Sequence, residues 1–243
     1  MHGAPRTDIP ALQQFTPTFR QSATAVLTCH ARINAKSVML DQQLRAITDP
    51  LTKPVAAGLT RLNIPPSAIT LAGLLCGLAG CLLLANSSWL PGLSLLLLNR
   101  LCDGLDGQVA RMTRPSPFGG YLDSVCDQIF YAAVPLSFGF AADENLRPAL
   151  LLLFSFFASS GSFLAWAAIA TAYAADKTDQ PAKSFTYSAG LMEGAETILF
   201  FALFCLFPAD FPTLAAVFAA LCGCTALQRI LMAYQTFQSP RHQ

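Results

Sequence analysis

The stretch DGLDGQVAR, at residues 103–111, is followed seven residues later by GGYLDSVCD, at residues 119–127. Both segments lie in long apolar runs, and together they carry four aspartates: Asp103, Asp106, Asp123 and Asp127. A charged side chain near the centre of a bilayer costs about 2.5–3.5 kcal/mol or more. Four carboxylates in such a setting therefore predict a partner that neutralises them.

Helix geometry predicts that the four carboxylates share one site. Asp103 and Asp106 are three residues apart and share one face of a helix, and Asp123 and Asp127, four residues apart, share one face of the next. The segment between the helices is rich in proline, and the two pairs stand at nearly equal distances on either side of it. An antiparallel hairpin would therefore place all four about 10 Å below its cytoplasmic end.

Clustered carboxylates repel one another unless a cation neutralises them. Ligation by oxygen alone is typical of Mg²⁺, Mn²⁺ or Ca²⁺, and Mg²⁺ usually combines a few carboxylates with substrate phosphates. Four carboxylates can bridge two ions, which would polarise a phosphoryl group from both sides. Arg111 lies one turn nearer the cytoplasm and is suited to the same phosphates. The pattern predicts a metal-dependent phosphate site.

The composition places this hairpin in a membrane. Hydrophobic residues make up 53% of the 243-residue chain and charged residues only 12%, about half the share of a soluble domain. Six apolar runs are long enough, or nearly so, for a bilayer crossing of about 20 residues. They lie at 67–85, 90–112, 118–141, 148–174, 191–207 and 212–234. We therefore expect an all-α integral membrane protein with about six transmembrane helices, preceded by an amphipathic interfacial helix.

Four regions are expected along the chain. Residues 1–38 form a disordered extension, with translation starting at Met39; 39–66 form the amphipathic juxtamembrane helix, broken or kinked near Pro50 and Pro54; 67–234 form the transmembrane catalytic domain; and 235–243 form a cytoplasmic tail. With the amino terminus inside, only Arg147 among the loop basic residues lies outside. We expect a multi-pass protein of the bacterial inner membrane whose active site faces the cytoplasm. Without a basic block interleaved with aromatics, no nucleic-acid partner is expected.

The aspartate segment resembles the signature of the CDP-alcohol phosphatidyltransferase family, D-x2-D-G-x2-A-R-x7,8-G-x3-D-x3-D, at every specified position. The resemblance runs from about residue 40 to residue 234. It implies transfer of a phosphatidyl or similar substituted phosphate group from a CDP-linked donor, such as CDP-diacylglycerol, to the hydroxyl of an acceptor alcohol, with release of CMP. It also implies a homodimer and two divalent cations, Mg²⁺ or Mn²⁺.

The resemblance also implies roles for individual residues. Asp103, Asp106 and Asp123 would hold the cations, and Asp127 would deprotonate the acceptor hydroxyl and also touch the second ion. The cytidine diphosphate would be bound by Gly107, Ala110, Arg111 and Gly119. From the residues alone, the glycines and the alanine serve either substrate clearance or helix packing.

The sequence indicates less about the acceptor alcohol than about the donor. Arg114, Lys183 and Glu193 are possible acceptor-binding residues, although basic loop residues are also ordinary topology signals and Glu193 also fits a helix cap. Family members often have an arginine where this chain has Gly194, which argues against a phosphate-binding pocket there. Two alternative functions stay open: a membrane prenyltransferase, which would need a second aspartate-rich motif, and a cation transporter that uses the aspartate cluster.

Overall fold

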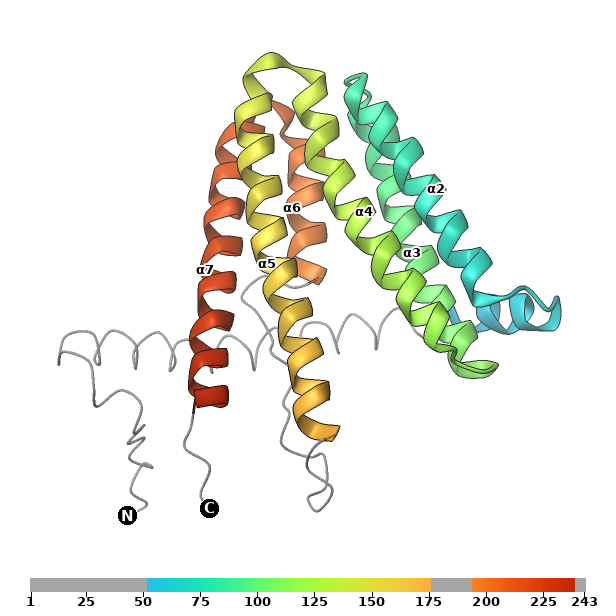
Figure 1. The fold of residues 1–243 in the computed structure, drawn as a ribbon. Helices are drawn as coiled ribbons and strands as arrows, with labels where there is room; N and C mark the ends of the chain where they lie inside the picture. The colour runs from blue at the N-terminus through green and yellow to red at the C-terminus, as the bar shows by residue number, and fades with distance from the viewer. Residues whose placement is uncertain (1–51, 176–193, 239–243) are drawn as a thin grey trace, which may run out of the picture.

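The computed structural model describes residues 52–175 and 194–238, where every regular element is a helix. A helix is described at residues 52–61. It precedes α2 (Pro66–Ala85), α3 (Trp89–Met112), α4 (Pro117–Ala141), α5 (Asp143–Ala175), α6 (Gly194–Leu206), the 3₁₀ turn η2 (Pro208–Asp210) and α7 (Phe211–Gln238). Figure 1 shows α2, α3 and α4 together on one side of the molecule and α5, α6 and α7 on the other. The all-α class predicted from the sequence is confirmed.

The helix at residues 52–61 and α2 are separated by a tight turn. Asn63 adopts φ 54°, a left-handed conformation that asparagine tolerates at the end of a helix. The backbone amide of Ile64 donates to the carbonyl of Leu59, and that of Asn63 donates to the carbonyl of Thr60. These bonds close the helix at residue 61, short of the predicted end at 66. Pro54 lies inside the helix, which is continuous over the described residues.

Helix α2 approaches α3 closely because glycines face the contact. A Cβ atom added at Gly73 would lie 2.8 Å from the Cβ of Cys102, and one added at Gly80 would lie 3.0 Å from the Cβ of Leu95. Side chains at these positions would push the two backbones apart. The small residues therefore let α2 reach the acidic face of α3.

Aromatic side chains hold α4 against the other half of the bundle. The Phe138 ring stacks on the Phe211 ring at 4.6 Å, and Phe204 meets Phe211 edge-to-face at 5.0 Å. Phe130 from α4 lies 6.1 Å from Phe201 of α6. All five rings are almost fully buried. The hairpin of α3 and α4 is thus fixed on a packed aromatic core.

The surface of the bundle is suited to lipid. Large apolar side chains point outward, including Phe140 at 75% exposed and Phe157 at 78% exposed. By length and composition, three helical spans among the described residues can cross a membrane: Pro66–Ala85, Asp143–Ile169 and Pro208–Tyr234. Helices α3 and α4 have 24 and 25 residues, but charged residues interrupt their apolar runs. The described part of α6 has 13 residues, fewer than the roughly 20 of a full crossing.

Candidate metal centre and nucleotide cavity

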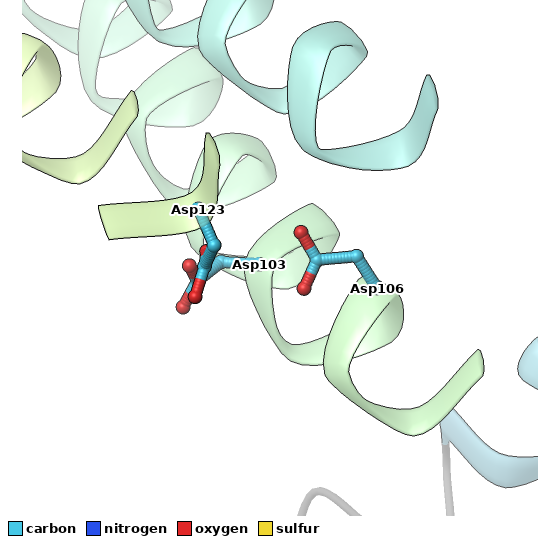
Figure 2. Close-up of side chains that lie close together, drawn as sticks. All are labelled: Asp103, Asp106 and Asp123. Atoms are coloured by element: carbon cyan, nitrogen blue, oxygen red, sulfur yellow. The ribbon is translucent and has the colours of Figure 1, made fainter. Parts of the chain in front are cut away.

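Three of the four predicted aspartates meet where α3 and α4 face each other. Asp103, Asp106 and Asp123 each offer a carboxylate oxygen, and these oxygens all lie within 4.8 Å of one another. Figure 2 shows Asp103 and Asp106 on one helix and Asp123 reaching them from the next. The spacing argument from the sequence placed these residues together, and the structure brings them together.

The three carboxylates differ in their surroundings. Asp106 is 5% exposed, and the hydroxyl of Thr70 on α2 donates a hydrogen bond to its Oδ2. Asp123 is less enclosed, but its Oδ1 is buried and has no hydrogen-bond partner among the described residues. A buried carboxylate oxygen without a donor is unfavourable unless a cation or another donor meets it. Such an atom fits a metal ligand.

Asp127 lies outside this group of three oxygens. Its Oδ1 accepts a hydrogen bond of 2.9 Å from the NH2 nitrogen of Arg100, which makes an ion pair between α4 and α3. The same guanidinium lies 3.7 Å from an oxygen of Asp103. The fourth aspartate is therefore near the other three but is held by a different partner.

Arg100 is the important site residue that the sequence argument did not single out. It lies one turn before Asp103, and no other charged residue occurs in α3 on its amino-terminal side. An arginine inside a membrane helix is as costly as an aspartate, and it needs a carboxylate or a polar partner. That rule could have identified Arg100, although spacing alone would not have shown which aspartate it pairs with.

Two hollows meet at the aspartates. A small polar one of about 10 Å³, roughly enough for one water molecule or ion, is lined by the four aspartates, Arg100 and residues of α2. A larger cavity of about 310 Å³ opens beside it and shares Asp106 and Asp123. Its other lining residues come from the start of α2, the end of α3, the α3–α4 turn and the start of α4. A ligand in the larger cavity would therefore touch the carboxylate group.

The larger cavity also contains most of the residues predicted to contact a nucleotide. Gly107, Ala110 and Gly119 line it, and so does Arg114, a possible acceptor-binding residue. Arg111 does not line it, but its NH1 nitrogen lies 3.4 Å from where a Cβ of Gly107 would be. Lys183 and Glu193 lie outside the described residues.

The start of α4 is fixed by its own cap. The Ser116 hydroxyl accepts a hydrogen bond of 3.0 Å from the backbone amide of Gly119, and Pro117 occupies the first turn. Ser116 and Gly119 both line the larger cavity. The positive end of the α4 dipole therefore lies at the larger cavity, which also contains Asp106 and Asp123.

The sequence pattern of the CDP-alcohol phosphatidyltransferase family matches residues 63–236, from the turn before α2 almost to the end of α7. This chain belongs to that family. Membership makes the protein a transferase of phospholipid biosynthesis, and it accounts for four aspartates kept in a membrane bundle.

Three known proteins are similar to this chain over different lengths. The inner membrane protein YnjF of Escherichia coli K12 is 42% identical over 206 residues, which cover 84% of this chain and all of that protein. The archaetidylinositol phosphate synthase of Methanothermobacter thermautotrophicus is 33% identical over 114 residues, 46% of this chain and 57% of that enzyme. The phosphatidylinositol phosphate synthase of Mycobacterium marinum is 38% identical over 92 residues, 37% of this chain and 39% of that enzyme.

Solved structures of a family member share the fold. The crystal structure of Mycobacterium tuberculosis phosphatidylinositol phosphate synthase with CDP-DAG bound has a TM-score of 0.63 at 22% identity, covering 79% of this chain and 96% of that one. The structure of the same enzyme with manganese and citrate has a TM-score of 0.61 at 24% identity, covering 78% and 90%. At such identities the likeness establishes the helical membrane fold.

Proposed function

We propose that this protein transfers a phosphatidyl or similarly substituted phosphate group from a CDP-linked lipid, such as CDP-diacylglycerol, to the hydroxyl of an acceptor alcohol and releases CMP. The observation that carries the proposal is the convergence of three carboxylates beside a cavity of about 310 Å³. Family membership and the CDP-DAG complex of the mycobacterial relative support the donor class. The reaction takes place in the inner membrane, at the cytoplasmic side.

Asp103, Asp106 and Asp123 are assigned as ligands of two divalent cations, Mg²⁺ or Mn²⁺. When bound, such ions neutralise the diphosphate and polarise the phosphorus that is attacked. The formal charge of the small hollow favours two ions over one. Its four carboxylates and the Arg100 guanidinium leave three negative charges, so a single divalent ion would leave the hollow repelling a diphosphate. Two ions would make it attractive.

The larger cavity is assigned to the cytidine diphosphate of the donor. Gly107, Ala110 and Gly119 present no bulky side chains to it, which leaves space for a nucleotide close to the backbone. Arg111 and Arg114 lie near its cytoplasmic side, where they would attract the negatively charged donor. The amino terminus of α4 adds backbone donors and a favourable dipole.

Asp127 is assigned as the base that accepts the proton of the acceptor hydroxyl. Its Oδ1 is engaged by Arg100, and we assign Oδ2 to that proton. The acceptor oxygen forms a bond to the β-phosphorus as the bond from that phosphorus to the bridging oxygen of CMP breaks. CMP leaves with the electron pair of that bond. Asp127 then holds one proton more than before, which it gives up to solvent.

Several kinds of alcohol are candidates for the acceptor. The relatives named as archaetidylinositol phosphate synthase and phosphatidylinositol phosphate synthase support testing a phosphorylated polyol, with Arg114 and Lys183 as candidates for its phosphate. Gly194 begins α6 and offers no charge to such a group. Glu193 is a candidate for contacts with a hydroxyl-rich or cationic acceptor. Inositol phosphate, glycerol 3-phosphate, serine and choline together separate these cases.

The test is turnover by the purified protein in lipid nanodiscs with CDP-diacylglycerol and Mg²⁺ or Mn²⁺, offered each acceptor in turn. We expect acceptor-dependent CMP release and a lipid product of the matching mass. Asp127→Asn should abolish turnover and leave donor binding measurable, because the base is lost and the ligand carboxylates remain. The matched control is Asp210→Asn, an exposed aspartate of η2 far along the chain from the site.

Two outcomes would contradict the proposal. The first is a protein that binds Mn²⁺ but neither CDP-diacylglycerol nor CDP, which would favour cation transport. The second is an Asp127→Asn variant that keeps full turnover, which would show that Asp127 is not the base.

A further inference from the structure

Phe118 is a large apolar side chain that is mostly exposed and yet lines the larger cavity. It is the second residue of α4 and is 66% exposed. Among the lining residues of the cavity that the structure describes, it is the one aromatic side chain. Neither buried core of the described helices includes it. Core packing therefore does not account for a phenylalanine at this position.

The larger cavity has an acidic end and an apolar end. At the acidic end, Asp106 and Asp123 face the proposed cations. At the opposite, cytoplasmic end, α2 and α4 both begin, and the cavity is lined there by Pro65, Pro66 and Phe118. This division fits a nucleoside diphosphate, because its charged diphosphate and its flat base lie at opposite ends of the ribose.

The spacing along α4 places Phe118 at the level of the base of such a ligand. Five residues separate Phe118 from Asp123, a rise of about 7.5 Å along the helix. In a nucleotide the ribose stands between the diphosphate and the base, so the base lies beyond the diphosphate by a length of that order. A diphosphate held at the carboxylates would therefore leave its base beside Phe118.

The backbone around Phe118 leaves space for a ring. A Cβ atom added at Gly120 would meet nothing within 4 Å, and one added at Gly107 would meet only NH1 of Arg111, at 3.4 Å. Neither glycine is thus needed for contact between helices, and both line the cavity. Its volume of about 310 Å³ lies within the range of small-molecule sites, about 300–1,000 Å³. These glycines are therefore explained better by ligand clearance than by helix packing.

Tyr121 separates a role in the cavity from a role at the membrane surface. Aromatic side chains near the ends of membrane helices often lie at the level of the lipid headgroups. Tyr121 follows Phe118 by three residues, shares its side of α4 and is 67% exposed, but it does not line the cavity. A surface role would apply to both side chains, whereas contact with a ligand in the cavity applies to Phe118.

We propose that the Phe118 ring stacks on the cytosine base of the CDP-linked donor and contributes to donor affinity. This inference rests on the proposed function, which supplies the ligand. Every nucleobase has a flat π face, so the contact adds affinity without choosing among bases.

The test is ligand affinity of the purified protein in lipid nanodiscs with Mg²⁺, measured by isothermal titration calorimetry. The probes are CDP, UDP and ribose 5-diphosphate, which has no base. Phe118→Leu should weaken CDP and UDP by a similar factor, about 5- to 50-fold, because stacking on an aromatic ring contributes an effect of that order. Its affinity for ribose 5-diphosphate should change less than about twofold. Phe118→Trp, which keeps an aromatic face, should bind CDP at least as well as Phe118→Leu binds ribose 5-diphosphate.

The matched control is Tyr121→Leu, which should leave the affinity for CDP unchanged. Because Phe118 is exposed, Phe118→Leu should fold, and a size-exclusion profile like that of the wild-type protein checks this. In turnover, the KM for CDP-diacylglycerol should rise in Phe118→Leu more than kcat falls, because the acidic end of the cavity is untouched.

Three results would overturn the inference. Phe118→Leu could bind CDP as tightly as the wild-type protein does. It could lose affinity for CDP and ribose 5-diphosphate equally, which would show an effect on the whole cavity and no contact with the base. Tyr121→Leu could weaken CDP as much as Phe118→Leu does, which would indicate a role at the membrane surface. A wild-type protein that binds neither CDP nor ribose 5-diphosphate would instead reject the proposed function, and this inference with it.

Discussion

Thr70 is the residue through which α2 reaches the ligand carboxylates. Its hydroxyl lies within hydrogen-bonding distance of both Asp106 Oδ2 and the carbonyl of Pro66, and the charged oxygen is the stronger acceptor. Replacing it with valine keeps the volume and removes the donor. We expect Thr70→Val to weaken Mn²⁺ affinity about 10- to 100-fold, because the loss of a hydrogen-bond partner behind a metal ligand commonly has an effect of that size.

The comparison for that variant is Thr113→Val, because the Thr113 hydroxyl donates to the carbonyl of Val109 in its own helix and contacts no ligand. Thr70→Ser should retain most of the affinity. Equal Mn²⁺ titration curves for Thr70→Val and Thr113→Val would show that the Thr70 hydroxyl does not orient Asp106.

For single residues, the sequence predicted which aspartates belong to the site. It did not predict that three form one group while Asp127 pairs with Arg100. Spacing and an apolar context were enough to group Asp103, Asp106 and Asp123, since helix periodicity determines which side chains share a face. The pairing of Asp127 with Arg100 depends on how α4 is rotated about its own axis relative to α3. Periodicity does not specify that rotation, and side-chain packing across the hairpin does.

Helices α2 and α4 meet at Gly77, close to the place where Arg100 lies over the Phe130 ring. A Cβ atom at Gly77 would lie 2.7 Å from the ring of Phe130, which in turn lies under the Arg100 guanidinium. Phe130 is fully buried and has little room to move. We expect Gly77→Ala to destabilise the protein by about 1 kcal/mol, since overpacking of about 1–3 kcal/mol outweighs the better helix propensity of alanine, about 1 kcal/mol.

The measurement for Gly77→Ala is the apparent melting temperature in detergent, compared with Gly223→Ala. Gly223 lies in α7 and has open space where a Cβ would be, so alanine there gains helix propensity without a clash. Gly77→Ala should melt below the wild-type protein and Gly223→Ala at or above it. Equal melting temperatures for the two variants would contradict a close contact at Gly77.

The helix limits show what apolar run length reveals and what it misses. The predicted spans 67–85, 90–112 and 118–141 each differ by one residue or less at either end from α2, α3 and α4. The fourth span was expected to begin at Pro148, but α5 begins at Asp143 and contains the proline. Asp143 and Glu144 favour the start of a helix, and a missing hydrogen bond near a helix end costs little where water reaches the carbonyl.

Across the whole molecule, charge separates the two ends of the bundle. In the part of the chain that the structure describes, the end that carries the candidate site holds Lys53, Arg61, Arg111 and Arg114. The opposite end, where α4 meets α5 and α6 meets α7, holds one basic residue, Arg147, with three acids: Asp143, Glu144 and Asp210. Figure 1 shows the helix at residues 52–61 and the α3–α4 turn at the same end of the molecule.

That asymmetry predicts the orientation, because basic residues in short loops are retained on the cytoplasmic side of a membrane. In a background with Cys29 and Cys224 replaced by alanine, we expect Arg147→Cys to react with a membrane-impermeant maleimide in intact cells. Thr113→Cys, at the site end, should react only after the membrane is permeabilised. A reagent that labels Thr113→Cys from outside would place the candidate site away from the cytoplasm. Cytoplasmic CDP-linked donors would then be out of its reach, so the orientation of the bundle bears directly on the proposed reaction.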